Sequence, residues 1–155
     1  VKPVRGLVDV AIEAGAASIT FHPDAVLDVA AELRYIRGHG VEAGLALSPS
    51  QPVSLLAPYL DAIDWVLLMT VVPGFGGQAF LPNGLSRIQA CRAMLDAVDA
   101  SVRPRLAVDG GVHPGNIASV SAQGADLAVV GSALFAHPPL AARFALLEAD
   151  LDKAS

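Results

Sequence analysis

The sequence predicts an α/β fold, namely an incomplete (β/α)8 TIM barrel with about five parallel strands and six helices. Short apolar segments alternate with amphipathic ones along the chain, as in parallel strands joined by helical crossovers. The 155 residues are 54% hydrophobic and 16% charged, more apolar than an average soluble domain, as strands buried on both faces require. The first element is an amphipathic helix with no strand before it, as if a βα unit had been cut at the end of its strand.

The individual elements follow from spacing and from helix breakers. A helix is expected over residues 3–14, because apolar residues recur at helical spacing and Gly15 can cap its end. A short buried strand is expected at 17–22, followed by a helix whose apolar positions run from Val26 to Ile36 and which ends near Gly38 or Gly40. Further strands are expected at 42–47, 64–70, 105–109 and 126–131, with helices near 52–60, 82–98, 114–123 and 138–151.

Five strands leave two architectures open. A doubly wound sheet like that of flavodoxin fits the length, whereas a complete barrel of ~250 residues needs about three further strands. The first helix without a strand favours the barrel. In either case residues 1–155 are expected to form a single domain.

Several classes of protein are disfavoured by composition. No apolar run approaches the ~20 residues of a membrane span, and residues 1–20 contain no secretory signal pattern. A net charge of −5 without a basic cluster argues against nucleic-acid binding. Cys91 is the only cysteine and falls in a helical pattern, so we expect a buried thiol in a reducing, cytoplasmic environment.

The first segment with chemical character is Met69–Phe80, MTVVPGFGGQAF, directly after an apolar strand. Three glycines within four residues allow backbone N–H groups to approach an anion closely, which is how phosphate cradles are built. A mobile glycine-rich turn is the alternative interpretation.

Two further segments end predicted strands in the same way. In Ala107–Val112, AVDGGV, the carboxyl end of the strand would direct Asp109 toward a substrate, although an aspartate here could instead cap the next helix. In Val129–Phe135, VVGSALF, Gly131 and Ser132 open a helical segment whose amides could bind phosphate, and close packing of the glycine is the alternative.

Taken in order, these segments resemble those of the ribulose-phosphate 3-epimerase family along the whole chain. The matching segments are ITFHPDA, GLALSPSQP, LLMTVVPGFGGQAF, RLAVDGGVHPGNI and GADLAVVGSALF. The resemblance implies that the strands are barrel strands four to eight. Three N-terminal strands are then lacking, which in the family carry a serine, a His-x-Asp-x-Met segment and a His-Leu-Met segment.

The resemblance also implies an activity in the pentose phosphate pathway. The family interconverts D-ribulose 5-phosphate and D-xylulose 5-phosphate by metal-assisted proton transfer through an enediolate, so a phosphorylated ketopentose is the expected substrate. It implies that Asp109 is one acid/base group and also a ligand of a divalent metal ion (Zn, Fe, Mn or Co), and that the complete protein is a homo-oligomer. The implied substrate-binding residues are Gly74, Phe75, Gly76 and Gly77 in the loop, Gly110, Gly111, Gly131 and Ser132 at the phosphate, and Met69 beside the sugar.

Other interpretations stay open at this point. The same phosphate cradle would serve a six-carbon substrate such as allulose 6-phosphate, and the chain could be a non-catalytic, phosphate-binding remnant. Without the second acid/base group and the metal histidines, we expect the chain alone to be inactive. Val72 departs from the family, which often has a polar residue there. His22 is expected to be structural or to support the site indirectly, and the loop histidines His39, His113 and His137 to be solvated.

Overall fold

The computed structural model describes residues 4–72, 74, 76–99, 103–136 and 139–152. Within these residues five strands form one sheet in the order β1-β2-β3-β4-β5, and every neighbouring pair is parallel. The strands are β1 (Ser18–Phe21), β2 (Glu42–Leu47), β3 (Trp65–Met69), β4 (Arg105–Asp109) and β5 (Leu127–Val129). All five predicted strands are therefore confirmed, some with shorter ends than expected.

Six α-helices are described, and five of them match helices that the sequence predicts. The described α-helices are α1 (Val4–Glu13), α2 (Val29–Gly38), α3 (Gly84–Asp96), α4 (Ile117–Ala122), α5 (Ser132–Phe135) and α6 (Leu140–Leu151). Two 3-10 segments, η1 (Pro23–Ala25) and η2 (Val53–Ala62), complete the list. Pro3 and His137 lie outside the described residues. None of the described helices is long and apolar enough to cross a membrane.

Three helix predictions need correction, and each has a local cause. The helix expected near 52–60 is the 3-10 segment η2, which contains Pro58, a residue without an N–H to donate to a regular α-helix. The helix expected from Val26 begins at Val29, because the carboxylate of Asp28 accepts a hydrogen bond from the Ala31 N–H at 2.9 Å and caps it. The helix expected over 114–123 begins at Ile117, after a turn in which Asn116 accepts from the His113 N–H.

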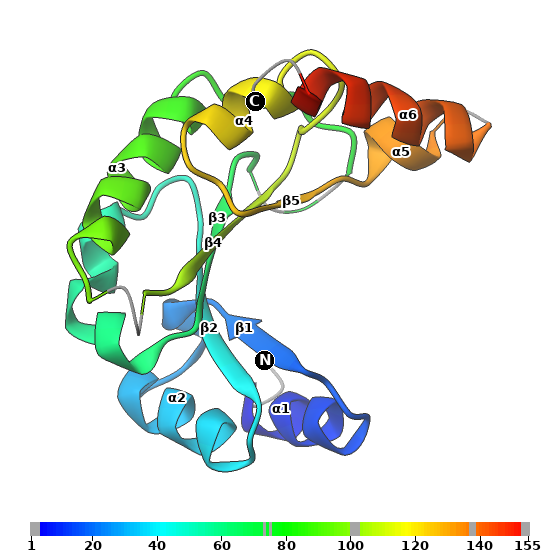
Figure 1. The fold of residues 1–155 in the computed structure, drawn as a ribbon. Coiled ribbons are helices and arrows are strands. Elements are labelled where there is room, and N and C mark those ends of the chain that lie inside the picture. The colour runs from blue at the N-terminus through cyan, green and yellow to red at the C-terminus, as the bar shows by residue number, and fades with distance from the viewer. Residues whose placement is uncertain (1–3, 73, 75, 100–102, 137–138, 153–155) are drawn as a thin grey trace.

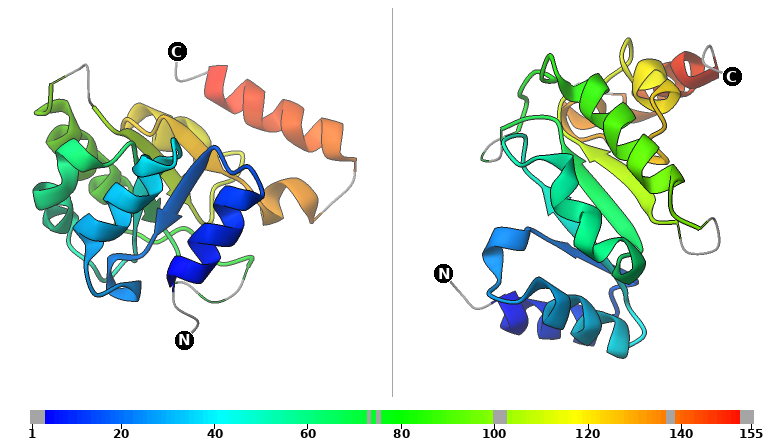
Figure 2. Two further views of the ribbon diagram at one scale, coloured as in Figure 1. Left: turned by 90° about the horizontal axis from the view of Figure 1, so that it is seen from below. Right: turned by 90° about the vertical axis from the view of Figure 1, so that its left-hand side faces the viewer.

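The sheet is curved but not closed. The strands lie along the inner side of a crescent, and α1 to α4 cover its outer side (Figure 1). The helices α1 and α6 lie at opposite ends of the sheet, near β1 and β5 respectively (Figure 2). Among the described residues, neither β1 nor β5 has a second strand neighbour. This is the incomplete barrel that the sequence predicts.

The hydrophobic core lies between the sheet and the outer helices. Alternate residues of β3, Val66 and Leu68, are fully buried, and the residues between them are half-buried because they face the open inner side. Cys91 on α3 belongs to this core and has no exposed surface, as expected from its helical position. Burial raises the pKa of the Cys91 thiol to about 12, so the group behaves as a small apolar side chain.

Two aspartates join neighbouring strands at their amino ends by the same kind of hydrogen bond, from a backbone N–H to a carboxylate. The carboxylate of Asp64, just before β3, accepts a hydrogen bond of 2.9 Å from the Ala43 N–H of β2. The carboxylate of Asp126, just before β5, accepts one of 2.7 Å from the Leu106 N–H of β4. Each aspartate therefore joins its own strand to the preceding one, in addition to the backbone ladder.

The amino end of the inner face carries a cluster of three side chains. The Trp65 indole N–H donates to the carboxylate of Glu42 at 2.6 Å, and the Arg105 guanidinium donates to the same carboxylate. The guanidinium also lies 3.9 Å from the centre of the Trp65 ring, within range of a cation–π contact. These contacts join β2, β3 and β4 at the end of the sheet opposite the predicted site.

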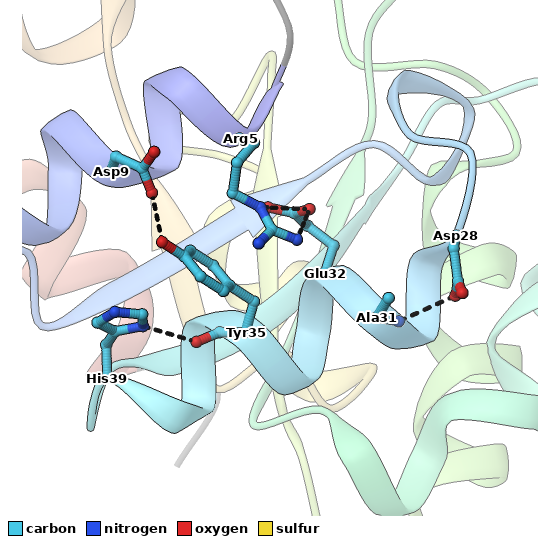
Figure 3. A network of polar contacts seen from close by, with 7 residues as sticks. All are labelled: Arg5, Asp9, Asp28, Ala31, Glu32, Tyr35 and His39. Carbon is cyan, nitrogen blue, oxygen red and sulfur yellow. Dashed lines mark hydrogen bonds and ion pairs between the residues drawn. The ribbon is translucent and has the colours of Figure 1, made fainter.

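A polar network joins the first two helices (Figure 3). Arg5 on α1 donates to the buried carboxylate of Glu32 on α2, with a shortest distance of 2.8 Å. The same guanidinium stacks over the Tyr35 ring, and the Tyr35 hydroxyl donates to Asp9 at 2.8 Å, a bond that raises the pKa of the phenol. Because burying Glu32 unpaired would be costly, Arg5 fixes α1 against α2.

His39, expected to be solvated, is exposed at the end of α2. Its ring packs against that of Tyr35, and its Nδ1 lies 2.9 Å from the Tyr35 carbonyl oxygen.

The open strand edges predict self-association of the chain. Leu127 on the edge strand β5 is 46% exposed, and such edges favour pairing between molecules. We expect the chain to elute as a dimer or larger species in size-exclusion chromatography with light scattering, and Leu127→Lys to shift it toward the monomer. Leu7→Lys on α1, where the leucine is 56% exposed, is the matched control and should change nothing. A monodisperse wild-type monomer with a cooperative melt would contradict this expectation.

Candidate functional site

A pocket of about 550 Å³ lies at the carboxyl ends of β3, β4 and β5. Its walls come from the segments that follow these three strands, and nine of the predicted site residues line it. These nine are Met69, Gly74, Gly76, Gly77, Asp109, Gly110, Gly111, Gly131 and Ser132. Phe75, the tenth predicted residue, lies outside the described residues.

The strand register explains why these residues meet. Met69 is paired with Asp109, and Asp109 with Val129, so the three strands end at the same level. The loop after β3 then crosses the end of β4 toward β5. Its glycines Gly76 and Gly77 approach Ser132, since a Cβ built on either glycine would lie within 4 Å of the Ser132 Oγ. Segments more than fifty residues apart in the sequence thus form one pocket.

The turn after β4 requires glycine at two successive positions. Gly110 and Gly111 have positive φ angles of 114° and 67°. A Cβ on Gly110 would lie 2.4 Å from a methyl group of Val71, and a Cβ on Gly111 would lie 2.4 Å from the Phe80 backbone nitrogen. Both the backbone conformation and the closeness of the preceding loop therefore exclude a side chain. The turn and the loop fit directly against each other.

Thr70 is a pocket-supporting residue that the sequence analysis missed. It follows β3, is 1% exposed, and its hydroxyl lies 2.6 Å from the Gly110 carbonyl oxygen and 3.0 Å from that of Asp109. Its N–H donates to the Asp109 carbonyl, and its own carbonyl accepts from the Leu81 N–H. A polar residue at the end of the otherwise apolar run WVLLM was the available signal.

The Asp109 carboxylate is half-buried at the pocket wall. Within the described part of the chain, it has no hydrogen-bond or ion-pair partner, and no backbone N–H donates to it. The alternative that Asp109 caps the next helix therefore receives no support. The residue before α4 is Asn116, seven residues further on. The carboxylate is available to a ligand in the pocket.

Asp109 does not form a metal site with other described residues. No group of three His, Cys, Asp or Glu side chains within the described ranges is placed to hold a metal ion. His113 also lines the pocket, but it is exposed and its Nδ1 lies 2.6 Å from the Pro114 carbonyl oxygen. His22 follows β1 and is not part of the pocket wall; its Nδ1 is buried without a partner in the described chain. These residues do not fit a complete divalent metal site.

The fold and the site together define a protein of the TIM-barrel class, here with an open sheet and a pocket at the carboxyl ends of its strands. The solved structures of similar fold are TIM-barrel enzymes. One is 3-hexulose-6-phosphate synthase from Salmonella typhimurium, with a TM-score of 0.68 and 18% identity over 97% of this chain and 68% of that chain. Another is the tryptophan synthase alpha-subunit of Pyrococcus furiosus, with a TM-score of 0.63 and 21% identity over 97% and 59% of the two chains.

The chain belongs to the ribulose-phosphate 3 epimerase family, whose sequence model matches residues 1–135. Ribulose-phosphate 3-epimerase 1 of Cupriavidus necator is 48% identical over 140 residues, which are 89% of this chain and 58% of the relative. Ribulose-phosphate 3-epimerase of Escherichia coli K12 is 44% identical over 138 residues, with shares of 89% and 60%. The chain thus spans about three fifths of the length of these curated relatives.

The close packing of the Gly110–Gly111 turn against the preceding loop predicts an effect on stability. Gly111→Ala should lower the free energy of unfolding by roughly 1–3 kcal/mol, because the added methyl meets the Phe80 backbone at a positive φ. Gly38→Ala is the matched control: Gly38 lies within α2, has no positive φ, and has open space around its Cβ position. We expect it to change the free energy of unfolding by less than about 1 kcal/mol. Urea denaturation of both variants checks this, and equal effects would refute the packing described here.

Proposed function

We propose that the protein to which this chain belongs is a ribulose-phosphate 3-epimerase, interconverting D-ribulose 5-phosphate and D-xylulose 5-phosphate. The observation that carries the proposal is an unpaired carboxylate, Asp109, in the same pocket as three glycine-rich segments. Family membership and the names of the relatives support the same activity.

In this proposal the two ends of the substrate contact different walls of the pocket. The phosphate lies against the backbone amides of Gly110, Gly111 and Gly131 and the hydroxyl of Ser132, an arrangement in which fixed N–H dipoles face an anion. Met69 and Asp109, adjacent across β3 and β4, are then beside the ketose carbons. The part of the loop with Gly74, Gly76 and Gly77, which lines the pocket, covers the substrate and excludes water.

The chemistry is a proton transfer at C3, the carbon beside the C2 ketone. A carboxylate removes the C3 proton, the electron pair moves into the carbonyl to give an enediolate, and a second acid returns a proton to the opposite face. Asp109 supplies one of these two groups, since its carboxylate is free to accept or donate a proton in the pocket. The second group is proposed to come from a segment that this chain does not contain.

A divalent metal ion would stabilise the negative oxygen of the enediolate as a Lewis acid. The described residues offer it one carboxylate, whereas protein sites for such ions usually use three or more side chains. We therefore assign no step to a metal in this chain.

The proposed function predicts that the chain alone has no meaningful epimerase activity and that completing it restores activity. The N-terminal part of the Cupriavidus necator relative, up to the residue that aligns with Val1, would be fused to this chain. A coupled assay for the two pentulose phosphates should detect turnover in the fusion and none in the isolated chain. A fusion that folds but is inactive would contradict the proposed epimerase function. An isolated chain that is active would contradict the need for a second acid/base group.

Within the fusion, Asp109→Asn tests the assigned acid/base group. The substitution keeps the shape of the side chain and removes its negative charge, so kcat should fall by at least ~10²-fold while the melting temperature changes little. Asp24→Asn, at an exposed aspartate of η1, is the matched control and should retain full turnover. Near-normal turnover in Asp109→Asn would rule out the assignment.

A further inference from the structure

The Thr70 hydroxyl lies directly beneath the turn that follows β4. Of its two acceptors, the Gly110 carbonyl oxygen is nearer, at 2.6 Å, than that of Asp109, at 3.0 Å. A hydroxyl has one hydrogen to donate, so Gly110 is its principal acceptor. The Asp109 carbonyl keeps a second donor, the Thr70 N–H at 2.8 Å. Loss of the hydroxyl would therefore affect chiefly the Gly110 carbonyl.

The orientation of that carbonyl determines the direction of the next amide. In a trans peptide unit the C=O and the following N–H point in opposite directions. Because Thr70 holds the Gly110 C=O, the Gly111 N–H points away from Thr70. No described residue accepts a hydrogen bond from the Gly111 N–H, and Gly111 lines the pocket. The Asn116 side chain donates to the Gly111 carbonyl at 3.0 Å and fixes the other side of this residue.

Thr70 also closes the base of the loop above the turn. Its carbonyl accepts a hydrogen bond of 2.9 Å from the Leu81 N–H, which brings together the two ends of the loop 71–80. The same loop packs against both glycines of the turn, through Val71 on Gly110 and Phe80 on Gly111. One buried residue thus contacts the turn and both ends of the loop.

We propose that Thr70 is a positioning residue for the phosphate group of the substrate. Its hydroxyl fixes the Gly110–Gly111 peptide so that the free Gly111 N–H is ready to donate to a phosphate oxygen. The inference rests on the proposed function for the existence of a phosphate ligand, and it adds a residue that touches neither the ligand nor the reacting carbons. A preoriented amide binds an anion better because no rotation of the peptide is needed on binding.

The test uses inorganic phosphate as the probe and three forms of the chain. Thr70→Val has the shape of threonine without the hydroxyl, and Thr70→Ser keeps the hydroxyl without the methyl group. We expect Thr70→Val to bind phosphate about tenfold more weakly, which corresponds to 1.4 kcal/mol, and Thr70→Ser to bind as the wild type does. In the wild type, the amide NMR signal of Gly111 should shift on titration with phosphate.

The outcomes separate the inference from the function on which it rests. Equal phosphate affinity in Thr70→Val and the wild type would overturn the positioning role and leave the proposed function intact. A wild type that does not bind phosphate would overturn the phosphate site and the inference with it. If Thr70→Val does not fold, the wild-type and Thr70→Ser titrations decide: an unshifted Gly111 signal while phosphate binds elsewhere overturns the inference.

Discussion

In-register pairing of the parallel strands β3, β4 and β5 is the constraint on which the rest of this structure depends. Because the ladder aligns Met69, Asp109 and Val129, three loops start from the same level and meet over one pocket. Parallel strands always have their carboxyl ends at the same edge of a sheet, so the loops converge without any further device. The buried Thr70 then adds hydrogen bonds between two of these strand ends.

The polar groups at the two ends of the sheet differ in whether they have hydrogen-bond partners. At the amino end, Trp65 and Arg105 share the carboxylate of Glu42, and these polar groups satisfy one another. At the carboxyl end, the Asp109 carboxylate and the Gly111 N–H have no partner within the described residues. Polar groups left unpaired in a native structure are a common mark of a binding site, whereas paired ones contribute to the scaffold. This contrast supports placing the site at the carboxyl end.

Much of this arrangement was predictable from the sequence, because strand ends and glycines carry local signals. Asp109 followed by two glycines predicted a strand end that faces the site, and the positive φ of both glycines was found in the structure. The structure adds the Phe80 backbone as the neighbour that excludes a side chain at Gly111. A polar residue after WVLLM marked Thr70 as unusual, but its hydrogen-bond acceptors were not predictable, since they lie at the end of a strand about forty residues later. Whether Asp109 was free or capped a helix was likewise a matter of tertiary geometry, and Pro58 turned an expected α-helix into a 3-10 segment.

The two aspartates at the amino ends of β3 and β5 affect how the sequence of such a chain can change during evolution. Asp64 and Asp126 each fix a strand pair at the edge farthest from the pocket. The alignment of the strands is therefore secured independently of the loops at the other edge. Insertions or substitutions in those loops can alter what is bound without shifting the framework beneath them. Strand register and ligand choice are thus encoded mainly in separate stretches of sequence, whereas the turn glycines Gly110 and Gly111 contribute both to the pocket wall and to the packing of the fold.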